Sequence, residues 1–171
     1  HQVKELLELM QPKMNKYMLH TPTVKQAIFM NLPVKEAFFG GAAGGGKSDA
    51  LLMDALQNVD KKGYAAIIFR KTYADLVKPG ALIDRSKEWL FRHNDVSILQ
   101  FGYLENDNDR FNYQGGEYQY IGFDEVTHIL ENNYRYMFSR LRRVLGLDIP
   151  LKVRGASNPP DDDQGVWVFD R

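Results

Sequence analysis

Hydrophobic residues in this chain follow two patterns in turn. Some segments are short apolar runs, the clearest being Tyr64–Phe69, and a run of this kind is typical of a parallel strand covered on both faces. Other segments repeat apolar residues three or four positions apart, as at Leu52 and Leu56, and this spacing indicates amphipathic helices. Strand-like and helix-like segments therefore alternate along the chain.

The patterns, with the caps and turns between them, predict an order of elements. The predicted strands are 35–40, 64–69, 96–103, 118–123 and 151–156. The predicted helices are 2–10, a helix through Met30 that Thr23 caps, 47–58, 82–91 and 131–145. A polar turn at 106–109 is predicted to lead into a hairpin return at 110–113, and 158–163 is predicted to be a loop. Alternating strands and helices imply an α/β fold with a mainly parallel central sheet and helices on both faces.

The composition narrows the functional classes. A chain of 171 residues fits one domain, and 44% hydrophobic with 26% charged residues is ordinary for a globular protein. Lysine plus arginine equals aspartate plus glutamate at 22 each, so bulk charge draws the chain neither to nucleic acid nor to a membrane. The lack of cysteine excludes disulfides and thiolate metal sites. No apolar run approaches the roughly 20 residues of a membrane span, so no membrane association is expected.

A glycine-rich segment follows the first predicted core strand and opens the next predicted helix. Its pattern, Gly-x-x-x-x-Gly-Lys-Ser, is that of a phosphate-binding P-loop, and its position between strand and helix favours this over a chance surface turn. Such a loop turns backbone N–H groups towards phosphate oxygens, its lysine reaches the β- and γ-phosphates, and its serine hydroxyl helps to hold Mg²⁺. The predicted nucleotide-binding residues are Gly41, Ala42, Ala43, Gly44, Gly45, Gly46, Lys47 and Ser48.

Two carboxylates, Asp124 and Glu125, end the predicted strand at 118–123. In a Walker B motif the first holds Mg²⁺ and the second orients and deprotonates the attacking water. Two solvated carboxylates at a strand end would look the same, and the upstream P-loop is what favours the catalytic interpretation. The adjacent pair also favours an ATPase of the additional-strand type over a signalling GTPase.

Weaker signals come from two polar segments. Ser157 and Asn158, after Ala156, end the last predicted strand, where a polar side chain can respond to the γ-phosphate, although Asn-Pro turns are common anywhere. Gln26 precedes the first core strand, where an amide can hydrogen-bond an adenine edge, although a lone glutamine is more often structural.

Arginines cluster after the Walker B segment. Arg140 and Arg143 are predicted to lie on one face of the helix 131–145, three residues apart. A solvated basic face and an arginine finger, which stabilises transition-state charge in ATPase rings, both fit this pattern.

Together these motifs resemble the ATPase domain of the large terminase subunit of tailed bacteriophages. The resemblance runs from about Thr21 to Pro159, and its P-loop is shared with many nucleotide hydrolases, whereas the order of its segments is more specific. The segments are Val24–Gln26, Gly40–Ser48, Phe69–Tyr73 with Pro79–Gly80, Phe101–Asn106, Tyr120–Glu125, Tyr134–Tyr136 with Ser139–Arg143, and Ala156–Pro159.

The resemblance implies an enzyme that hydrolyses ATP with Mg²⁺ and drives double-stranded DNA into a procapsid. It implies Lys47 and Glu125 as catalytic residues, Ser48 and Asp124 as metal-binding residues, and Arg140 as a finger that enters a neighbouring subunit. It also places Gln26 in an adenine-recognition segment and makes Ala156, Ser157 and Asn158 the segment that couples hydrolysis to movement. The implied partners are the portal protein and the small terminase subunit, in a pentameric ring at the portal vertex in the cytoplasm of the infected bacterial host, with slow hydrolysis by an isolated monomer.

The sequence also departs from the family pattern. Positions 42–45 lack the basic residue that many large terminases carry inside the P-loop, so that role is expected to fall to an arginine in trans. The stretch between Trp89 and Leu99 is short for the family, and a loop is expected to be absent there. Up to Arg171 the sequence offers no set of metal-binding acids for the family's nuclease domain, with 161–163 expected to be a solvated loop, so no nuclease activity is expected.

We therefore expect one ATPase domain over 1–171, with an N-terminal helical segment at 1–34, a core at 35–160 and the start of a linker at 161–171. Two other functions stay open. One is a helicase-like or recombinase-like ATPase, which would need further motifs, and the other is a nucleotide-dependent binding switch with little turnover.

Overall fold

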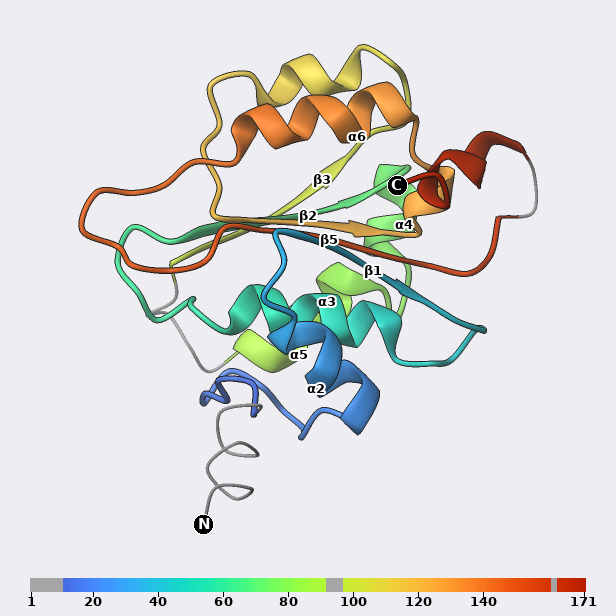
Figure 1. Cartoon of the computed structure of the whole chain (residues 1–171). Coiled ribbons are helices and arrows are strands. Elements are labelled where there is room, and N and C mark those ends of the chain that lie inside the picture. Colours follow the sequence, from blue (N-terminus) through green and yellow to red (C-terminus); the bar gives the residue numbers. More distant parts are fainter. Residues whose placement is uncertain (1–10, 92–96, 161–162) are drawn as a thin grey trace.

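A central sheet of five parallel strands organises the chain (Figure 1), whose computed structural model describes residues 11–91, 97–160 and 163–171. The strands are β1 (Glu36–Gly40), β2 (Ala65–Arg70), β3 (Ile98–Tyr103), β4 (Tyr120–Asp124) and β5 (Lys152–Ser157). Their order in the sheet is β1-β5-β4-β2-β3, and every neighbouring pair is parallel. The predicted α/β fold is confirmed, and all strands end at one edge of the sheet.

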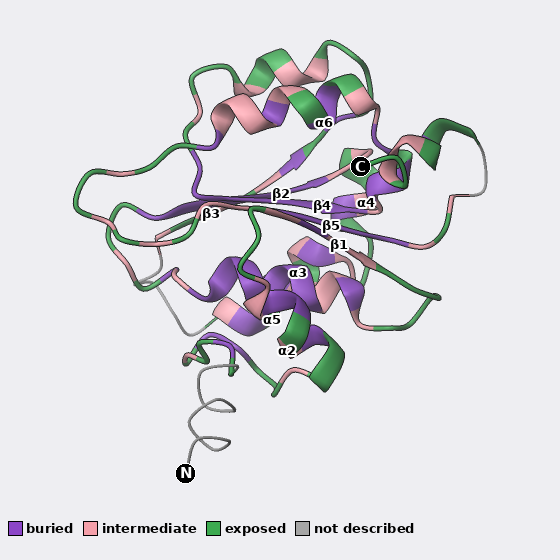
Figure 2. Cartoon of the chain, in the orientation of Figure 1, coloured by how far each residue is buried: buried purple, intermediate pink, exposed green. Residues whose placement is uncertain are grey.

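Helices cover both faces of this sheet, as predicted (Figure 1). One face carries α2 (Val24–Asn31), α3 (Lys47–Leu56) and α5 (Leu82–Leu90), and the other carries α6 (Glu131–Met137). Figure 2 shows the inner strands β2, β4 and β5 as a buried layer between them, whereas the edge strands β1 and β3 are partly exposed. A short helix, α4 (Tyr73–Val77), was not predicted, and the predicted helix 2–10 lies outside the described residues.

The hairpin return predicted at 110–113 is wrong. Residues Asp109–Tyr113 form a 3₁₀ helix, η1, and β3 pairs with β2 in parallel. The carboxylate of Asp109 accepts the backbone N–H groups of Glu105 and Asn106, both at 2.8 Å, and so closes the chain into a turn. The Tyr113 ring then packs edge-on against Phe69 at 4.8 Å, which holds this segment over the sheet instead of beside it.

The helix predicted at 131–145 ends early. Helix α6 stops at Met137, a 3₁₀ turn η3 follows at Phe138–Arg140, and the chain then becomes extended. The backbone is extended here because it pairs with Tyr118, just before β4. The backbone N–H of Tyr118 donates to Arg140 O at 3.0 Å, and that of Arg142 donates to Tyr118 O at 2.9 Å. Arg140 and Arg143 therefore do not share a helix face, and that part of the prediction is wrong.

A buried ionic cluster ties α3 to β5 and to the connector before β1. Asp54 of α3 accepts a 2.7 Å hydrogen bond from Lys152 Nζ, and its other oxygen lies 3.2 Å from Arg154 Nε. Asp54 and Arg154 have fully buried side chains. The Arg154 guanidinium also donates to the carbonyls of Leu32 and Val34, at 3.0 and 3.2 Å. The cluster thus fixes where the chain enters β1, the strand that leads into the glycine loop.

The start of β1 is also tied to the last described residue. Glu36 accepts hydrogen bonds from Tyr134 Oη at 2.6 Å and from Arg171 Nε at 2.8 Å. Burial disfavours the ionised form of Glu36, but these two hydrogen bonds outweigh it and lower the pKa of Glu36. Residues Asp163–Val168 form a 3₁₀ segment, η4, so Asp163 is not part of the loop expected there, while 161–162 lie outside the described residues.

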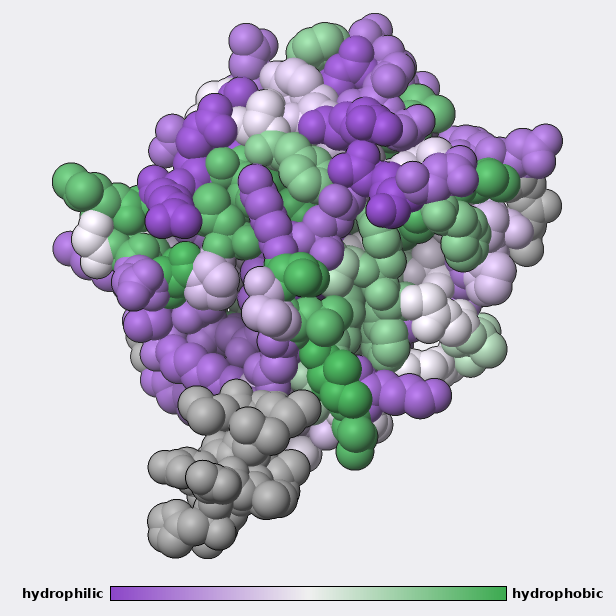
Figure 3. Space-filling view, in the orientation of Figure 1, coloured by the Kyte–Doolittle hydropathy of each residue, from purple (hydrophilic) through white to green (hydrophobic). Residues whose placement is uncertain are grey.

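Hydrophobic side chains reach the surface over α2 and the connector that follows it (Figure 3), where Val24, Ile28 and Val34 are exposed. Within the described ranges, no helix combines the length and apolar character needed to cross a membrane.

Candidate active site at the carboxyl edge of the sheet

The glycine loop leaves β1 and enters α3 through backbone conformations that favour glycine. Gly44 and Gly46 have φ of 77° and 70°, and Gly46 is the N-cap of α3. The side-chain amide of Gln26 donates to Gly46 O at 2.8 Å, and a Cβ added at Gly46 would lie 2.5 Å from Gln26 Nε2. The geometry therefore requires glycine at this position and fixes the loop against α2.

Lys47, the first residue of α3, is folded into the loop. Its side chain is largely buried, and Nζ donates to the carbonyls of Gly41 and Ala42 at 3.0 and 2.7 Å. The same ammonium donates to Asn158 Oδ1 at 2.9 Å. Asn158 follows β5, so this contact joins the glycine loop to a neighbouring strand end over a separation of 111 residues.

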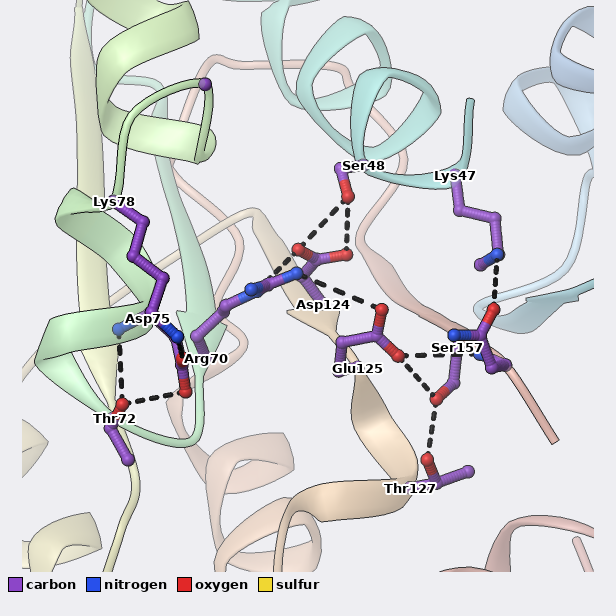
Figure 4. A network of polar contacts seen from close by, with 12 residues as sticks. Lys47, Ser48, Arg70, Thr72, Asp75, Lys78, Asp124, Glu125, Thr127 and Ser157 are labelled. Atoms are coloured by element: carbon purple, nitrogen blue, oxygen red, sulfur yellow. Dashed lines mark hydrogen bonds and ion pairs between the residues drawn. The ribbon is translucent and has the colours of Figure 1, made fainter. Parts of the chain in front are cut away.

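Ser48, Asp124 and Arg70 meet one step further along α3 (Figure 4). Ser48 Oγ lies 2.9 and 3.1 Å from the carboxylate oxygens of Asp124, and Arg70 Nε donates to Asp124 Oδ2 at 2.7 Å. Burial raises the pKa of Asp124, although Arg70 and Ser48 counteract it.

A hydroxyl and a carboxylate at this spacing are hard oxygen donors that suit Mg²⁺. No group of three or more metal-binding side chains occurs among the residues that the structure describes. Mg²⁺ in nucleotide sites is commonly held by one or two carboxylates together with substrate phosphates, and the donors present fit that mode.

Glu125 occupies a strained position directly after β4. Its φ of 53° and ψ of 54° are left-handed, the one such conformation of a non-glycine residue in the described chain. Glu125 Oε2 accepts from Ser157 Oγ at 3.1 Å and from the Asn158 backbone N–H at 3.4 Å. Ser157 Oγ in turn lies 2.6 Å from Thr127 Oγ1, so Thr127 can donate to Ser157, and Ser157 to the carboxylate (Figure 4).

These groups surround a cavity of about 270 Å³ at the carboxyl edge of the sheet. Its walls are the glycine loop, the first turn of α3, one side chain from α5, and the residues after β4 and β5. The lining residues are Ala43, Gly44, Gly45, Gly46, Lys47, Ser48, Asp49, Arg85, Glu125 and Asn158. Phosphate-binding donors and a carboxylate base thus face one space, as phosphoryl transfer to water requires.

Two predicted site residues do not line the cavity: Arg140 lies away from it, and the Gln26 amide is hydrogen-bonded within the protein. Arg140 lies on the α6 side of the sheet, where Nε donates to Ser139 Oγ at 3.0 Å and the guanidinium covers the Tyr136 ring at 5.6 Å. Gln26 accepts the Thr23 backbone N–H at 2.8 Å besides its bond to the loop, so both ends of its amide have protein partners. The roles of Arg140 as a finger in trans and of Gln26 in adenine recognition stay predictions.

The sequence patterns did not identify three residues that lie at or beside the site. Arg70 ends an apolar strand at the carboxyl edge, and a charged residue at such a position was an available signal. Thr127 lies in the turn after Glu125, where a small hydroxyl residue has no distinctive pattern. Arg85 lies on a helix with other charged residues, and only its packing against α3 brings it to the cavity.

One protein-family model matches this chain over residues 38–169, and its description is terminase large subunit, T4likevirus-type, N-terminal. The matched region includes the glycine loop, the carboxylates of Asp124 and Glu125 and the segment after β5, and it begins after Gln26. Searches of the curated proteins and of the solved structures give no match.

Proposed function

Since the chain belongs to the family of terminase large subunits, as their N-terminal part of the T4likevirus type, we propose that it is the ATP-hydrolysing motor domain of a viral genome-packaging terminase. In this role it couples ATP hydrolysis to the movement of double-stranded DNA into a procapsid. Residues 1–171 form one ATPase domain in this proposal, with 35–160 as its core.

The observation that carries the proposal is the convergence of Lys47, Ser48, Glu125 and Asn158 around one cavity, with Asp124 bonded to Ser48 beside it. They come from one helix and two strand ends, and these three segments lie far apart in the sequence. A structural cluster of this kind would not require a glycine loop with left-handed residues facing a strained carboxylate. A loop that cradles phosphate and a carboxylate that orients water are both recurring parts of phosphoryl-transfer sites.

In the proposed reaction Glu125 orients a water molecule and accepts its proton as the water attacks the γ-phosphate. Lys47 exchanges its carbonyl partners for phosphate oxygens and neutralises their charge. Ser48 and Asp124 hold Mg²⁺, which when bound lowers the negative charge on the phosphates. Asn158 touches Lys47 through its side chain and Glu125 through its backbone, so it can report the state of the nucleotide to β5.

The strand order supports the additional-strand class of P-loop ATPases. Strand β5 lies between β1, which carries the P-loop, and β4, which carries the two carboxylates. The inserted strand ends in Ala156, Ser157 and Asn158, and these residues are the proposed coupling segment. Movement of this segment relative to Lys47 and Glu125 would transmit hydrolysis to the rest of the sheet.

The proposal also includes the assembly in which the protein acts. We place the active protein in a pentameric ring at the portal vertex, in the host cytoplasm, with the portal protein and the small terminase subunit as partners. Arg140 is half-buried, and within the described residues it forms no ion pair with a carboxylate. It is the proposed finger in trans.

Hydrolysis of ATP and of GTP, each with and without double-stranded DNA, tests this function. A motor is expected to prefer ATP and to respond to DNA or to rising protein concentration, whereas a nucleotide switch would turn over slowly under all conditions. Glu125→Gln is expected to abolish turnover and retain ATP binding, and Glu131→Gln, on the surface of α6, is the matched control. Wild-type turnover by Glu125→Gln would refute the catalytic assignment.

A further inference from the structure

The cavity lined by the glycine loop is also lined by an arginine of the same chain, Arg85 of α5. Helix α5 lies beside α3 on the same face of the sheet (Figure 1), so Arg85 approaches the first turn of α3 from the side. Loop positions 42–45 carry no charge. Lys47 and Arg85 are therefore the cationic side chains that line this cavity within the described chain.

Two contacts aim the Arg85 guanidinium at the loop. Nη1 lies 2.5 Å from the carboxylate of Asp49, in the first turn of α3, and Nε donates to Gly80 O at 2.7 Å. Gly80 lies in a turn with φ of 71°, and its N–H is held by Asp84 Oδ2 at 2.8 Å. Arg85 Nη2 has no hydrogen-bond partner among the residues that the structure describes, so its two donors remain for a ligand.

The anchor of Arg85 is itself supported from a third segment. The other oxygen of Asp49 lies 3.6 Å from His20 Nε2, and the His20 ring packs edge-on against Trp89, four residues after Arg85 on α5. The Arg85 side chain is 39% exposed and lines the cavity. These contacts thus hold the Arg85 side chain in place while it remains accessible to a nucleotide.

Two other arginines, Arg70 and Arg140, contact other groups and do not line this cavity. Arg70 is bound to Asp124 at 2.7 Å and lies 3.9 Å from Glu125, so its charge neutralises the two Walker carboxylates. Arg140 lies on the opposite face of the sheet over Tyr136. Neither lines the cavity formed by the glycine loop.

We propose that Arg85 is a catalytic residue that acts in cis and binds the terminal phosphate of ATP through Nη2. This inference rests on the proposed ATPase function. Arginine presents planar, always charged donors that match phosphate oxygens, and it here adds to Lys47 a second positive charge within one subunit. The site then needs a neighbouring subunit to complete the transition state, but it recognises ATP by itself.

Calorimetric titration with ATPγS and with ADP, both in Mg²⁺, tests the assignment. Wild type is expected to bind ATPγS more tightly than ADP. A hydrogen bond between charged partners predicts that Arg85→Ala weakens ATPγS binding about 10- to 100-fold and ADP binding less than about threefold. Arg135→Ala, which removes an arginine paired with Glu131 on the surface of α6, is the matched control and is expected to change neither affinity.

An unchanged ratio of the two affinities in Arg85→Ala would overturn the inference, and so would equal weakening of both ligands. Wild type that binds neither nucleotide would instead overturn the proposed function. If Arg85→Ala does not fold by circular dichroism, Arg85→Gln, which keeps the side chain's length and polarity, carries the same expectation. Recovery of ATPase activity on mixing Arg85→Ala with Lys47→Ala would show that Arg85 acts in trans and would refute its placement in cis.

Discussion

The buried ionic cluster of Asp54, Lys152 and Arg154 gives a sharp prediction about stability. Asp54→Asn keeps the shape of the side chain and removes its negative charge. Arg154 is fully buried and the Lys152 side chain is 13% exposed, so the substitution leaves two cations that water can hardly reach. Burial already lowers the pKa of Lys152, although Asp54 raises it.

The expected cost follows from this burial. Removing one partner of a buried ion pair costs about 3–5 kcal/mol, because the remaining charge is left uncompensated. A surface pair at a similar distance contributes about 0–1 kcal/mol. Asp60 and Lys13 form such a pair at 3.1 Å, with side chains 44% and 45% exposed, so Asp60→Asn is the matched control.

Equilibrium unfolding in urea and thermal unfolding at pH 7, both followed by far-ultraviolet circular dichroism, measure the free energy of unfolding and the Tm of both variants. Asp54→Asn is expected to lower the free energy of unfolding by about 3–5 kcal/mol and the Tm by about 6–20 °C, at about 2–4 °C per kcal/mol. Asp60→Asn is expected to change it by less than about 1 kcal/mol. A loss below about 1 kcal/mol for Asp54→Asn, or equal losses in both variants, would refute the reasoning from burial.

Three further substitutions test the fold and the site. The folded-state pKa of Glu36 lies below its ordinary value of 4.5, so its stabilising effect is present above that pH and is lost as the pH falls through the folded-state pKa. Glu36→Gln should therefore be less stable than wild type at pH 7, with the gap closing on acidification below about pH 4.5; a gap independent of pH would contradict this. Gly46→Ala forces a Cβ into a left-handed position 2.5 Å from Gln26 Nε2, and we expect about 1–3 kcal/mol of lost stability with weaker ATP binding in calorimetry; wild-type values for both would be inconsistent with the loop geometry. Ser157→Ala removes the 3.1 Å hydrogen bond to Glu125, and kcat in steady-state assays should fall about 10- to 100-fold at unchanged ATP affinity; a kcat within twofold of wild type would exclude this positioning role.

Much of the core architecture was predictable from local pattern. The continuous apolar run at 64–69 predicted β2, because a strand without alternating polar residues is typical of a sheet that is covered on both faces. The Thr23 cap placed the start of α2, where its hydroxyl and the Gln26 amide form a capping box. In both cases the information lies within a few residues, so no knowledge of distant contacts was needed.

The errors occur where distant contacts override local preference. The sequence at 138–145 favours a helix, but backbone hydrogen bonds to Tyr118 draw this segment into an extended path. Residues 109–113 form a 3₁₀ helix that lies over the sheet, because Tyr113 packs edge-on against Phe69, which is distant in the sequence. Such contacts depend on neighbours in space, which a pattern of hydrophobic spacing does not contain.

The sequence by itself determined the local motifs of this protein and, through them, its family: a loop with Lys47 and Ser48, and a strand followed by the carboxylates of Asp124 and Glu125. Residue type and spacing within a few positions define each motif. Tertiary structure alone decided that Arg85 lines the cavity, because helix packing and not spacing brings α5 to α3. Strand order likewise decided that Asn158 touches Lys47, since β5 is inserted beside β1 from 111 residues away.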